Sequence, residues 1–260
     1  MKPAALSLLA AFAFVAHGAF ASPPPGYTLH WSDEFSGTRL DATKWKHWLP
    51  GRRRDATNVP EAVTLRDGFL TITTYTERGA HFTGMISTDG IFGARFGYLE
   101  ARIKWSDSPG MWSAFWCQTP TMGNPKGDVA AAGAEIDIAE HRAVDEQGKN
   151  IAPTVNFGLH WDGYGKDHKN KGHASQDWKL NEGFHTYGFE WTESSYTISI
   201  DGKTAWTVNE PISKRAEFIV LSSEVDDKAW ATHIPAQGYG DRPTSRTKLV
   251  VDYVRYYTKP

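Results

Sequence analysis

The chain has 260 residues, with 28 Lys and Arg against 30 Asp and Glu, and a formal net charge of −2. Hydrophobic residues make up 40% and charged residues 22%, which is typical of a folded chain and excludes a disordered one. The near-neutral charge gives no basic surface for nucleic acid or an anionic membrane. The single cysteine excludes an internal disulfide and a thiolate zinc site.

The N-terminal segment has the features of a secretory signal peptide. Lys2 precedes an almost unbroken apolar run from Ala4 to Ala16, which is too short to span a bilayer. The segment Ala19-Phe20-Ala21 fits the small-x-small cleavage rule, so we predict a signal peptide over residues 1–21 and cleavage after Ala21. A buried helix is the alternative, but Ser22-Pro23-Pro24-Pro25 could not continue it. We therefore expect export, to the periplasm or the medium.

The sequence after the signal peptide is dominated by strand patterns. Phe69 to Thr73 is rich in β-forming residues and follows the turn dipeptide Asp67-Gly68. Two alternating runs, Tyr196 to Ile200 and Thr204 to Val208, flank Asp201-Gly202, which predicts a hairpin. Further strands are predicted over residues 98–105, 218–221 and 249–257.

Helical periodicity is nearly absent. One short helix is predicted over Asp41 to Trp48, and two long loops are predicted over Gly123 to Gly133 and Gly163 to Ala174. Many strands with Gly and Asp turns, not alternating with helices, indicate an all-β protein with a sandwich or jelly-roll fold. No linker or shift of composition interrupts the sequence, so we expect a single domain over residues 22–260.

Three acids lie in one strand-like run. Alternate side chains of a strand share a face, so Glu135 and Asp137 share one face and Ile136 and Ile138 the other. Strict alternation would place Glu140 with the isoleucines. One extra residue, a β-bulge, would return Glu140 to the acidic face. We therefore predict three carboxylates in an open concavity and two isoleucines in the core.

Such a cluster suits hydrolysis of a glycosidic bond with retention of configuration. That reaction uses two carboxyl groups about 5–5.5 Å apart, one as nucleophile and one as acid. Crowding raises the pKa of one member, which keeps it protonated. The alternative is a surface strand with three solvated acids, which would give Ile136 and Ile138 no reason for burial.

The run Glu135-Ile136-Asp137-Ile138-Ala139-Glu140 resembles the active-site strand of glycoside hydrolase family 16 in its bulged form. The resemblance extends from Trp31 to Tyr257 and covers nearly all of the sequence after the signal peptide. Further segments similar to motifs of the family are Leu29 to Gly37, Phe96 to Lys104, Gly110 to Trp116, Phe184 to Thr192 and Val251 to Tyr257.

The resemblance implies a curved β-jelly roll of the concanavalin A-like lectin and glucanase type, with a sugar groove on its concave face. It implies that Glu135 is the nucleophile, Glu140 the acid/base and Asp137 the assisting acid. The reaction would be endo-cleavage of a β-linked polysaccharide through a covalent glycosyl-enzyme. We expect no cofactor for catalysis, a monomer, and a polysaccharide as the binding partner.

Aromatic side chains offer flat platforms for the C–H faces of sugars. Trp112 and Trp116 share strand parity, and we predict that they bind substrate together with Trp230. Core packing is the alternative for each of them. We predict that His160 and Trp161 also bind substrate, because they end a predicted strand where the family often has a histidine near the reacting sugar. A structural histidine is the alternative.

Metal ligands are not evident. The spacing of His141, His160, His168 and His173 matches no short zinc motif, so we expect no catalytic metal. The family resemblance implies a structural Ca²⁺ with an aspartate from the terminal strand, and Asp252 has that position. Calcium needs about six to eight oxygen ligands, so a plain surface acid is the alternative.

The substrate is less well specified than the reaction. The lead-in Asp128 to Ala134 lacks the Trp-Pro of the familiar β-1,3-glucanase form, and Ala139 replaces its usual Met. We expect a β-1,3- or β-1,3-1,4-glucan, with an agar-, porphyran- or carrageenan-type galactan as the alternative. A non-catalytic sugar-binding jelly roll is the alternative of another class. Arg52-Arg53-Arg54 and the Lys166 to Lys171 segment would suit a sulfated substrate, or are solvated charges.

Overall fold

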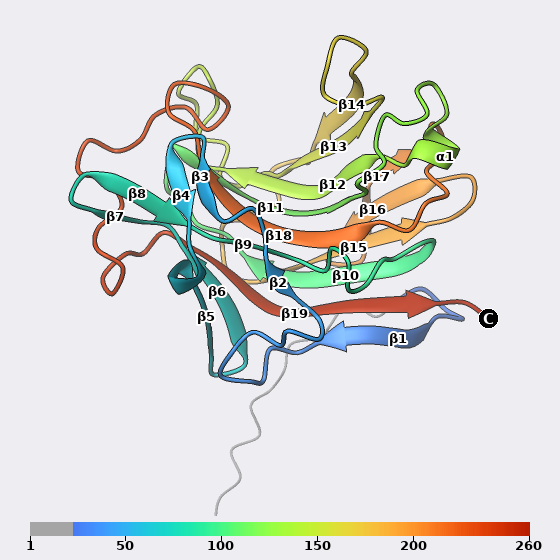
Figure 1. The fold of residues 1–260 in the computed structure, drawn as a ribbon, viewed down its shortest axis with the longest axis horizontal. Coiled ribbons are helices and arrows are strands. Elements are labelled where there is room, and N and C mark those ends of the chain that lie inside the picture. Colours follow the sequence, from blue (N-terminus) through green and yellow to red (C-terminus); the bar gives the residue numbers. More distant parts are fainter. Residues whose placement is uncertain (1–22) are drawn as a thin grey trace, which may run out of the picture.

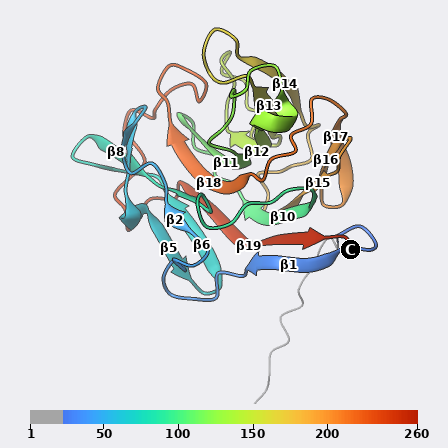
Figure 2. The ribbon, with the colours of Figure 1, turned by 45° about the vertical axis from the view of Figure 1, so that its right-hand side comes forward.

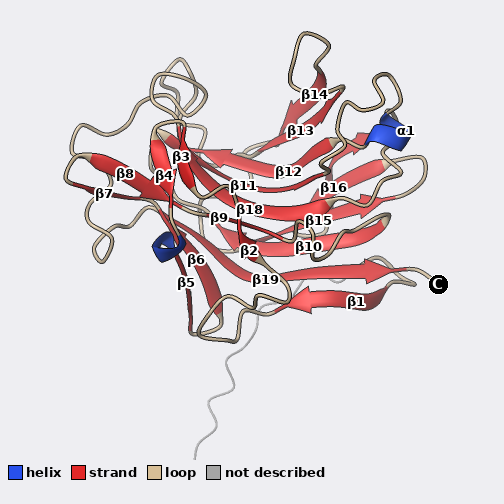
Figure 3. Ribbon diagram, in the orientation of Figure 1, coloured by secondary structure: helices blue, strands red, loops and turns tan. Residues whose placement is uncertain are grey.

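Strands form nearly all of the regular structure, as expected for an all-β protein (Figure 3). The computed structural model describes residues 23–260, so the predicted signal peptide lies outside the described residues. The helical segments of the described chain are η1 (Pro60–Ala62) and α1 (Val129–Ala132). Neither of these is long and apolar enough to cross a membrane.

The first large sheet has eight strands in the order β17–β16–β15–β10–β19–β6–β5, with β1 paired to β19 (Figure 1). The predicted hairpin at Asp201-Gly202 is confirmed and joins β16 to β17. The strands of this sheet are β1 (Thr28–Asp33), β5 (Val63–Arg66), β6 (Phe69–Thr73), β10 (Gly97–Lys104), β15 (His185–Trp191), β16 (Tyr196–Ile200), β17 (Lys203–Val208) and β19 (Lys248–Thr258).

The second large sheet has seven strands in the order β14–β13–β12–β11–β18–β9–β2. All neighbouring strands within this sheet are antiparallel. Strand β18 is visibly bent along its length in Figure 2. The strands are β2 (Lys46–His47), β9 (Met85–Ser87), β11 (Met111–Gln118), β12 (Glu135–Arg142), β13 (Asn156–Trp161), β14 (Lys169–Ala174) and β18 (Phe218–Val225).

A smaller sheet lies toward one end of the molecule (Figure 1). It has the order β3–β4–β8–β7, and its β4–β8 pairing is parallel. Its strands are β3 (Gly51–Arg53), β4 (Ala56–Asn58), β7 (Tyr75–Glu77) and β8 (Ala80–Thr83).

Side chains from both large sheets meet in one core cluster. Leu99 of β10 and Phe189 of β15 belong to it, as do Ile136 of β12 and Leu221 of β18. Each is at most 2% exposed, and burial of such a side chain stabilises the fold by about 1.5–3 kcal/mol. Because side chains alternate along a strand, the other face of β11, β12 and β18 is left for a surface groove.

The helix predicted over Asp41 to Trp48 is wrong. Asp41 instead closes a turn, in which its carboxylate accepts hydrogen bonds from the backbone N–H and the hydroxyl of Thr43 at 2.9 and 2.7 Å. The chain then becomes extended as β2, which pairs with β9. Trp45 is 1% exposed and donates its indole N–H to Asp33 at 2.9 Å. Burial of this ring and strand pairing outweigh the weak helical pattern.

The two predicted loops each contain a regular element. Within Gly123 to Gly133 lies α1, whose N-terminal Asp128 accepts a hydrogen bond from the backbone N–H of Ala131 at 3.1 Å. The second half of Gly163 to Ala174 is the edge strand β14. All six of its residues are exposed, so it has no apolar alternation from which a strand could be predicted.

Candidate active site

The acids of β12 are brought together by a bulge. On the side of β11, Phe115 pairs with Ala139 and Trp116 pairs with Asp137, so β12 has one extra residue, Ile138. The register with β13 shifts over the same stretch. The β-bulge predicted from the spacing of the acids is thereby confirmed.

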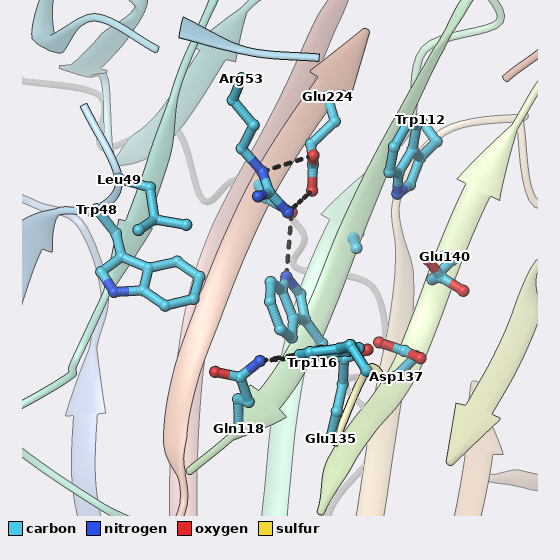
Figure 4. A pocket seen from close by; sticks show the side chains of 13 residues that line it. Trp48, Leu49, Arg53, Trp112, Trp116, Gln118, Glu135, Asp137, Glu140 and Glu224 are labelled. Carbon is cyan, nitrogen blue, oxygen red and sulfur yellow. Dashed lines mark hydrogen bonds and ion pairs between the residues drawn. The ribbon is translucent and has the colours of Figure 1, made fainter. Parts of the chain in front are cut away.

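The bulge separates the acids from the apolar residues of the strand. Glu135, Asp137 and Glu140 line the same cavity, whereas Ile136 and Ile138 pack in the core cluster at 1% and 0% exposure. The apolar back of β12 therefore anchors the strand, and its front presents three carboxyl groups on a rigid element (Figure 4).

Two cavities meet at these acids. The first, of about 440 Å³, lies over β11 and β18, and the second, of about 590 Å³, lies over β13 and β14. All three acids line both of them. The first is lined also by Trp48, Leu49, Arg53, Trp112, Trp116, Gln118, Tyr164, Ser222 and Glu224, and the second by Asn156, His160, Asn170, Lys171, His173 and Trp230.

The three tryptophans predicted to bind substrate lie along these cavities. Trp112 and Trp116 line the first at 6% exposure each. Trp116 donates its indole N–H to the hydroxyl of Ser222 at 3.1 Å. Its ring meets the ring of Trp48 edge-on, with the ring centres 5.6 Å apart (Figure 4). Trp230 lines the second cavity, and the guanidinium carbon of Arg142 lies 3.4 Å from the centre of its ring. Substrate contact by these rings stays a prediction.

His160 and Trp161 have different environments. His160 lines the second cavity, and its Nε2 lies 3.2 Å from Oδ2 of Asp137. Trp161 packs against the core cluster, and the structure does not bring it to either cavity. The reason is strand alternation, since neighbours on β13 face opposite sides.

The surroundings of two of the acids favour the protonated form of their carboxyl groups. Burial, followed by the charge of the neighbouring acids, raises the pKa of the Glu140 carboxyl well above its usual range. Burial and then the charge of Glu135 likewise raise the pKa of Asp137. Glu140 therefore has the protonation state that a general acid requires.

Glu135 receives two hydrogen bonds that the sequence did not suggest. Nε2 of Gln118 donates to its Oε2 at 3.0 Å, and the hydroxyl of Tyr164 donates to the same oxygen. The Tyr164 ring is 63% exposed, but burial of its hydroxyl and the charge of Glu135 raise the pKa of the phenol, which stays a donor. Both hydrogen bonds stabilise a negatively charged Glu135. Gln118 shares strand parity with Trp116, a signal that could have identified it.

The opposite wall of the first cavity is an ion-paired cluster. Nε of Arg53 lies 2.7 Å from Glu224, which is 5% exposed (Figure 4). Nε of Arg54 lies 3.2 Å from the same carboxylate. Arg54 also lies over the ring of Trp112 at 5.0 Å. Of the arginine run, Arg52 alone stands in an exposed pair, with Asp55 at 3.7 Å. Glu224 could have been found from its alternation with Ser222 on β18.

Two further candidate ligands, His141 and Asp252, line neither cavity. His141 is buried, stacks on Trp105 and places Nε2 2.8 Å from the carbonyl oxygen of Ala152, so it has a structural role. Asp252 accepts a hydrogen bond from Arg102 at 2.6 Å. A guanidinium at this distance repels a cation, so the contact does not fit the predicted calcium ligand. The calcium stays a prediction without support from Asp252.

Among the described residues, one group combines three histidine or acidic side chains at metal-binding spacing, namely Glu135, Asp137 and His160, whose ligand atoms lie within 4.8 Å of one another. The bulged strand, the neighbouring tryptophans and the raised pKa of Glu140 suit these groups for acid–base work on a sugar. The jelly-roll fold and the carboxyl cluster in its groove define a glycoside hydrolase.

The chain belongs to glycoside hydrolase family 16. The family model described as β-porphyranase A–D, GH16 domain, matches residues 28–259. This confirms the resemblance drawn from the motifs, and it covers both large sheets.

Curated relatives and solved structures are also similar to the chain. The chain is 27% identical to glucan endo-1,3-β-glucosidase A1 of Niallia circulans, over 70% of this chain and 30% of that protein. It is 29% identical to β-porphyranase E of Zobellia galactanivorans, over 87% and 85%. The crystal structure of porphyranase B from Zobellia galactanivorans superposes with a TM-score of 0.71 at 22% identity, covering 89% of this chain and 92% of that one.

The chain is shorter than several of its curated relatives. It spans 30% of the Niallia glucosidase and 60% of a β-glucanase of Acetivibrio thermocellus.

Proposed function

We propose that this protein is an endo-acting, retaining glycoside hydrolase of a β-linked polysaccharide. The observation that carries the proposal is the bulged strand β12, which directs Glu135, Asp137 and Glu140 into one groove. Membership of family 16 supports it, and so do relatives named as endo-glucanases and porphyranases.

The roles of the acids follow from their surroundings. Glu135 accepts two hydrogen bonds, which stabilise the carboxylate that attacks the anomeric carbon. Glu140, whose raised pKa keeps it protonated, gives its proton to the leaving oxygen. A water molecule then attacks the glycosyl-enzyme from the face that the leaving group has vacated. Glu140 takes a proton from this water, and the attack frees Glu135 as a carboxylate. Asp137 lies between the two and orients the nucleophile.

Endo-action is supported by the form of the groove. The acids line two cavities, one over β11 and β18 and one over β13 and β14, so space continues on both sides of the reacting bond. A chain that binds across both cavities would be cut internally. An exo-acting enzyme would need one side closed.

We propose a porphyran-type galactan as the first substrate. The match of residues 28–259 to a porphyranase model supports this choice. Lys171 and His173 line the second cavity, and such groups suit the sulfate esters of that polymer. A β-1,3- or β-1,3-1,4-glucan is the second candidate, because relatives named as glucan endo-1,3-β-glucosidase and β-glucanase match 70% and 85% of the chain.

The test is digestion of porphyran, agarose, carrageenan, laminarin and barley β-glucan. The reducing ends released are measured, and Glu135→Gln is the control. Cleavage of porphyran that the variant loses would support both reaction and substrate. Cleavage of a glucan alone would keep the reaction and replace the substrate. Binding without cleavage by the unmodified protein would favour a sugar-binding jelly roll instead.

Export is part of the proposal, because a polysaccharide is too large to enter a cell intact. The predicted leader over residues 1–21 supports it. Sequencing the N-terminus of the protein recovered from a secreting host should give Ser22 as the first residue. A start at Met1 would contradict the predicted cleavage.

A further inference from the structure

The segment between β13 and β14 contributes a second histidine to the acid cluster. Nδ1 of His160 lies 2.9 Å from Nε2 of His168. The two rings are parallel within 4°, with centres 5.1 Å apart, so the pair is joined edge to edge by a well-aligned hydrogen bond. On its other side, Nε2 of His160 lies 3.2 Å from Oδ2 of Asp137. The three groups therefore lie in a row, with a hydrogen bond between the two imidazoles and an ion-pair contact between His160 and Asp137.

This row of three groups runs from the interior toward solvent. The side chain of Asp137 is 7% exposed and that of His160 is 27% exposed, and His168 is half-buried. Asp137 lines both cavities but is little exposed, and the two imidazoles give its carboxyl a connected route toward solvent. Imidazole suits this task because one ring nitrogen can accept a proton while the other donates one.

The position of His168 is fixed by its own loop. Asp162, at the end of β13, accepts hydrogen bonds from the backbone N–H of Gly127 and from Lys169, both at 2.8 Å. Asp167, beside His168, pairs with Lys126. The backbone N–H of His168 closes a turn on Gly165 at 3.0 Å. The ring is thus held against His160 by contacts on both sides.

We propose that His168 is a positioning residue that, through His160, exchanges the proton of Asp137 with solvent during turnover. The inference rests on the proposed hydrolase function. This proton exchange is needed because the charge of Glu135 changes during the reaction. When Glu135 bonds to the sugar it loses its negative charge, and when the glycosyl-enzyme is hydrolysed that charge returns. The neighbouring Asp137 must release and regain a proton as this charge changes.

The transfer balances in protons and charge. In the uptake direction, His168 begins as an imidazolium and Asp137 as a carboxylate. The N–H bond at Nε2 of His168 breaks and one forms at Nδ1 of His160, while the N–H bond at Nε2 of His160 breaks and an O–H bond forms at Asp137. His168 and His160 end neutral, and Asp137 ends protonated. The proton that makes His168 an imidazolium enters from solvent at its Nδ1, which keeps that proton after the transfer, and release follows the same steps in reverse.

Other ionisable groups surround His160 and His168 and contribute to the electrostatic potential there. Glu135, Asp137 and Glu140 face the pair from β12. The further groups on the loop and on β14 are Tyr164, Asp167, Lys169, Lys171 and His173.

The test is His168→Ala, assayed on the polysaccharide that the unmodified protein cleaves. We expect KM to stay within about twofold and kcat to fall by about ten- to a hundredfold, since a positioned proton-transfer group contributes at least this much. Added imidazoles should restore kcat to a degree that follows their pKa. His168→Gln keeps a hydrogen bond to His160 but cannot pass a proton on, so it should show the loss without the rescue.

The matched control is His30→Ala, on β1 of the other sheet, where the ring is exposed and touches Tyr256 edge-on. It should leave kcat and its imidazole response unchanged. An unchanged kcat in His168→Ala would overturn the proposal. So would a loss that no imidazole restores, because a purely structural role predicts it.

A second readout does not depend on activity. Ring ¹⁵N spectra of the full protein should show a hydrogen-bonded Nδ1 of His160 that titrates together with His168, and this coupling should vanish in His168→Ala. Identical His160 signals in both proteins would overturn the relay. If the unmodified protein cleaves no polysaccharide while the coupling is present, the proposed function fails and the histidine pair stands.

Discussion

Glu135 and Glu140 are the same residue type on one strand, yet their environments give them opposite tasks. Glu135 accepts hydrogen bonds from Gln118 and Tyr164, which stabilise its charged form. Burial and nearby negative charge raise the pKa of Glu140, which stabilises its neutral form. A carboxylate that accepts hydrogen bonds beside a carboxyl group with a raised pKa is the arrangement expected of a nucleophile and an acid.

These roles predict the behaviour of Glu140→Ala. Loss of the general acid should lower kcat by about a hundred- to ten-thousandfold, the usual contribution of such a group. The truncated side chain leaves room beside the glycosyl-enzyme, so azide should raise the rate and give a glycosyl azide of retained configuration. The measurement is kcat with and without azide, with product identification by NMR. An absence of rescue, or an azide product of inverted configuration, would contradict the assigned role.

At the scale of elements, the acids depend on the strand beside them. Gly158 of β13 pairs directly with Asp137. A Cβ at this position would overlap the Asp137 carboxylate and would come within 3.1 Å of Nε2 of His160. The glycine is therefore required by close approach of the catalytic side chains and leaves β13 able to pair closely with the bulged β12.

Gly158→Ala should therefore impair catalysis more than folding. Displacing Asp137 by about 1 Å is expected to lower kcat about a hundredfold. The melting temperature should fall only slightly, because the added methyl group faces the cavity. The control is Gly165→Ala, where a Cβ would meet nothing within 4 Å. Equal kcat values for the two variants would show that Asp137 tolerates displacement.

The same elements show how far sequence reasoning extends. The spacing of Glu135, Asp137 and Glu140 was enough to predict both the strand and its bulge, because burial of Ile136 and Ile138 fixes which face is inside. Tyr164 and His168 could not be predicted in the same way. They lie in a polar loop far from β12 in sequence, and only the pairing of β13 with β12 and β14 brings them to the acids.

In the β2 region, the sequence predicted a helix that the structure does not contain. Asp41 to Trp48 has a weak helical pattern, but the buried Trp45 and the pairing with β9 decide its structure. Propensity over so short a segment is worth little against tertiary packing. Trp48, which follows this strand, thereby reaches the wall of the first cavity. Long-range pairing thus determined both the missed residues and the wrong helix.

At the scale of the whole molecule, a buried acid links the site to stability. Glu217 is 0% exposed, immediately precedes β18 and accepts a hydrogen bond from the backbone N–H of Ala134 at 3.0 Å. Its backbone also forms an isolated β-bridge with Ala94, which lies in the connection between β9 and β10. Glu217 therefore ties the residue before the nucleophile to a segment far away in sequence. Burial raises the pKa of its carboxyl to about 8.

This raised pKa predicts the pH dependence of unfolding. Between the ordinary value of 4.5 and about 8, the folded protein binds the Glu217 proton more strongly than the unfolded chain does. The contribution of this proton is therefore complete below the lower value and is lost as pH rises toward the upper one, with a slope of at most about 1.4 kcal/mol per pH unit. Glu217→Gln, which is neutral at every pH, should remove this slope.

The measurement is the free energy of unfolding in urea at several pH values from 5 to 9, for the unmodified protein and for Glu217→Gln. Asp137 and Glu140 also have a raised pKa and add to the slope of both proteins, so the difference between the two curves isolates Glu217. The variant should gain stability relative to the unmodified protein as pH rises from 5 to 8, and the difference should level off above that. Parallel curves would mean that Glu217 is ionised in the folded protein, with its charge compensated inside the core.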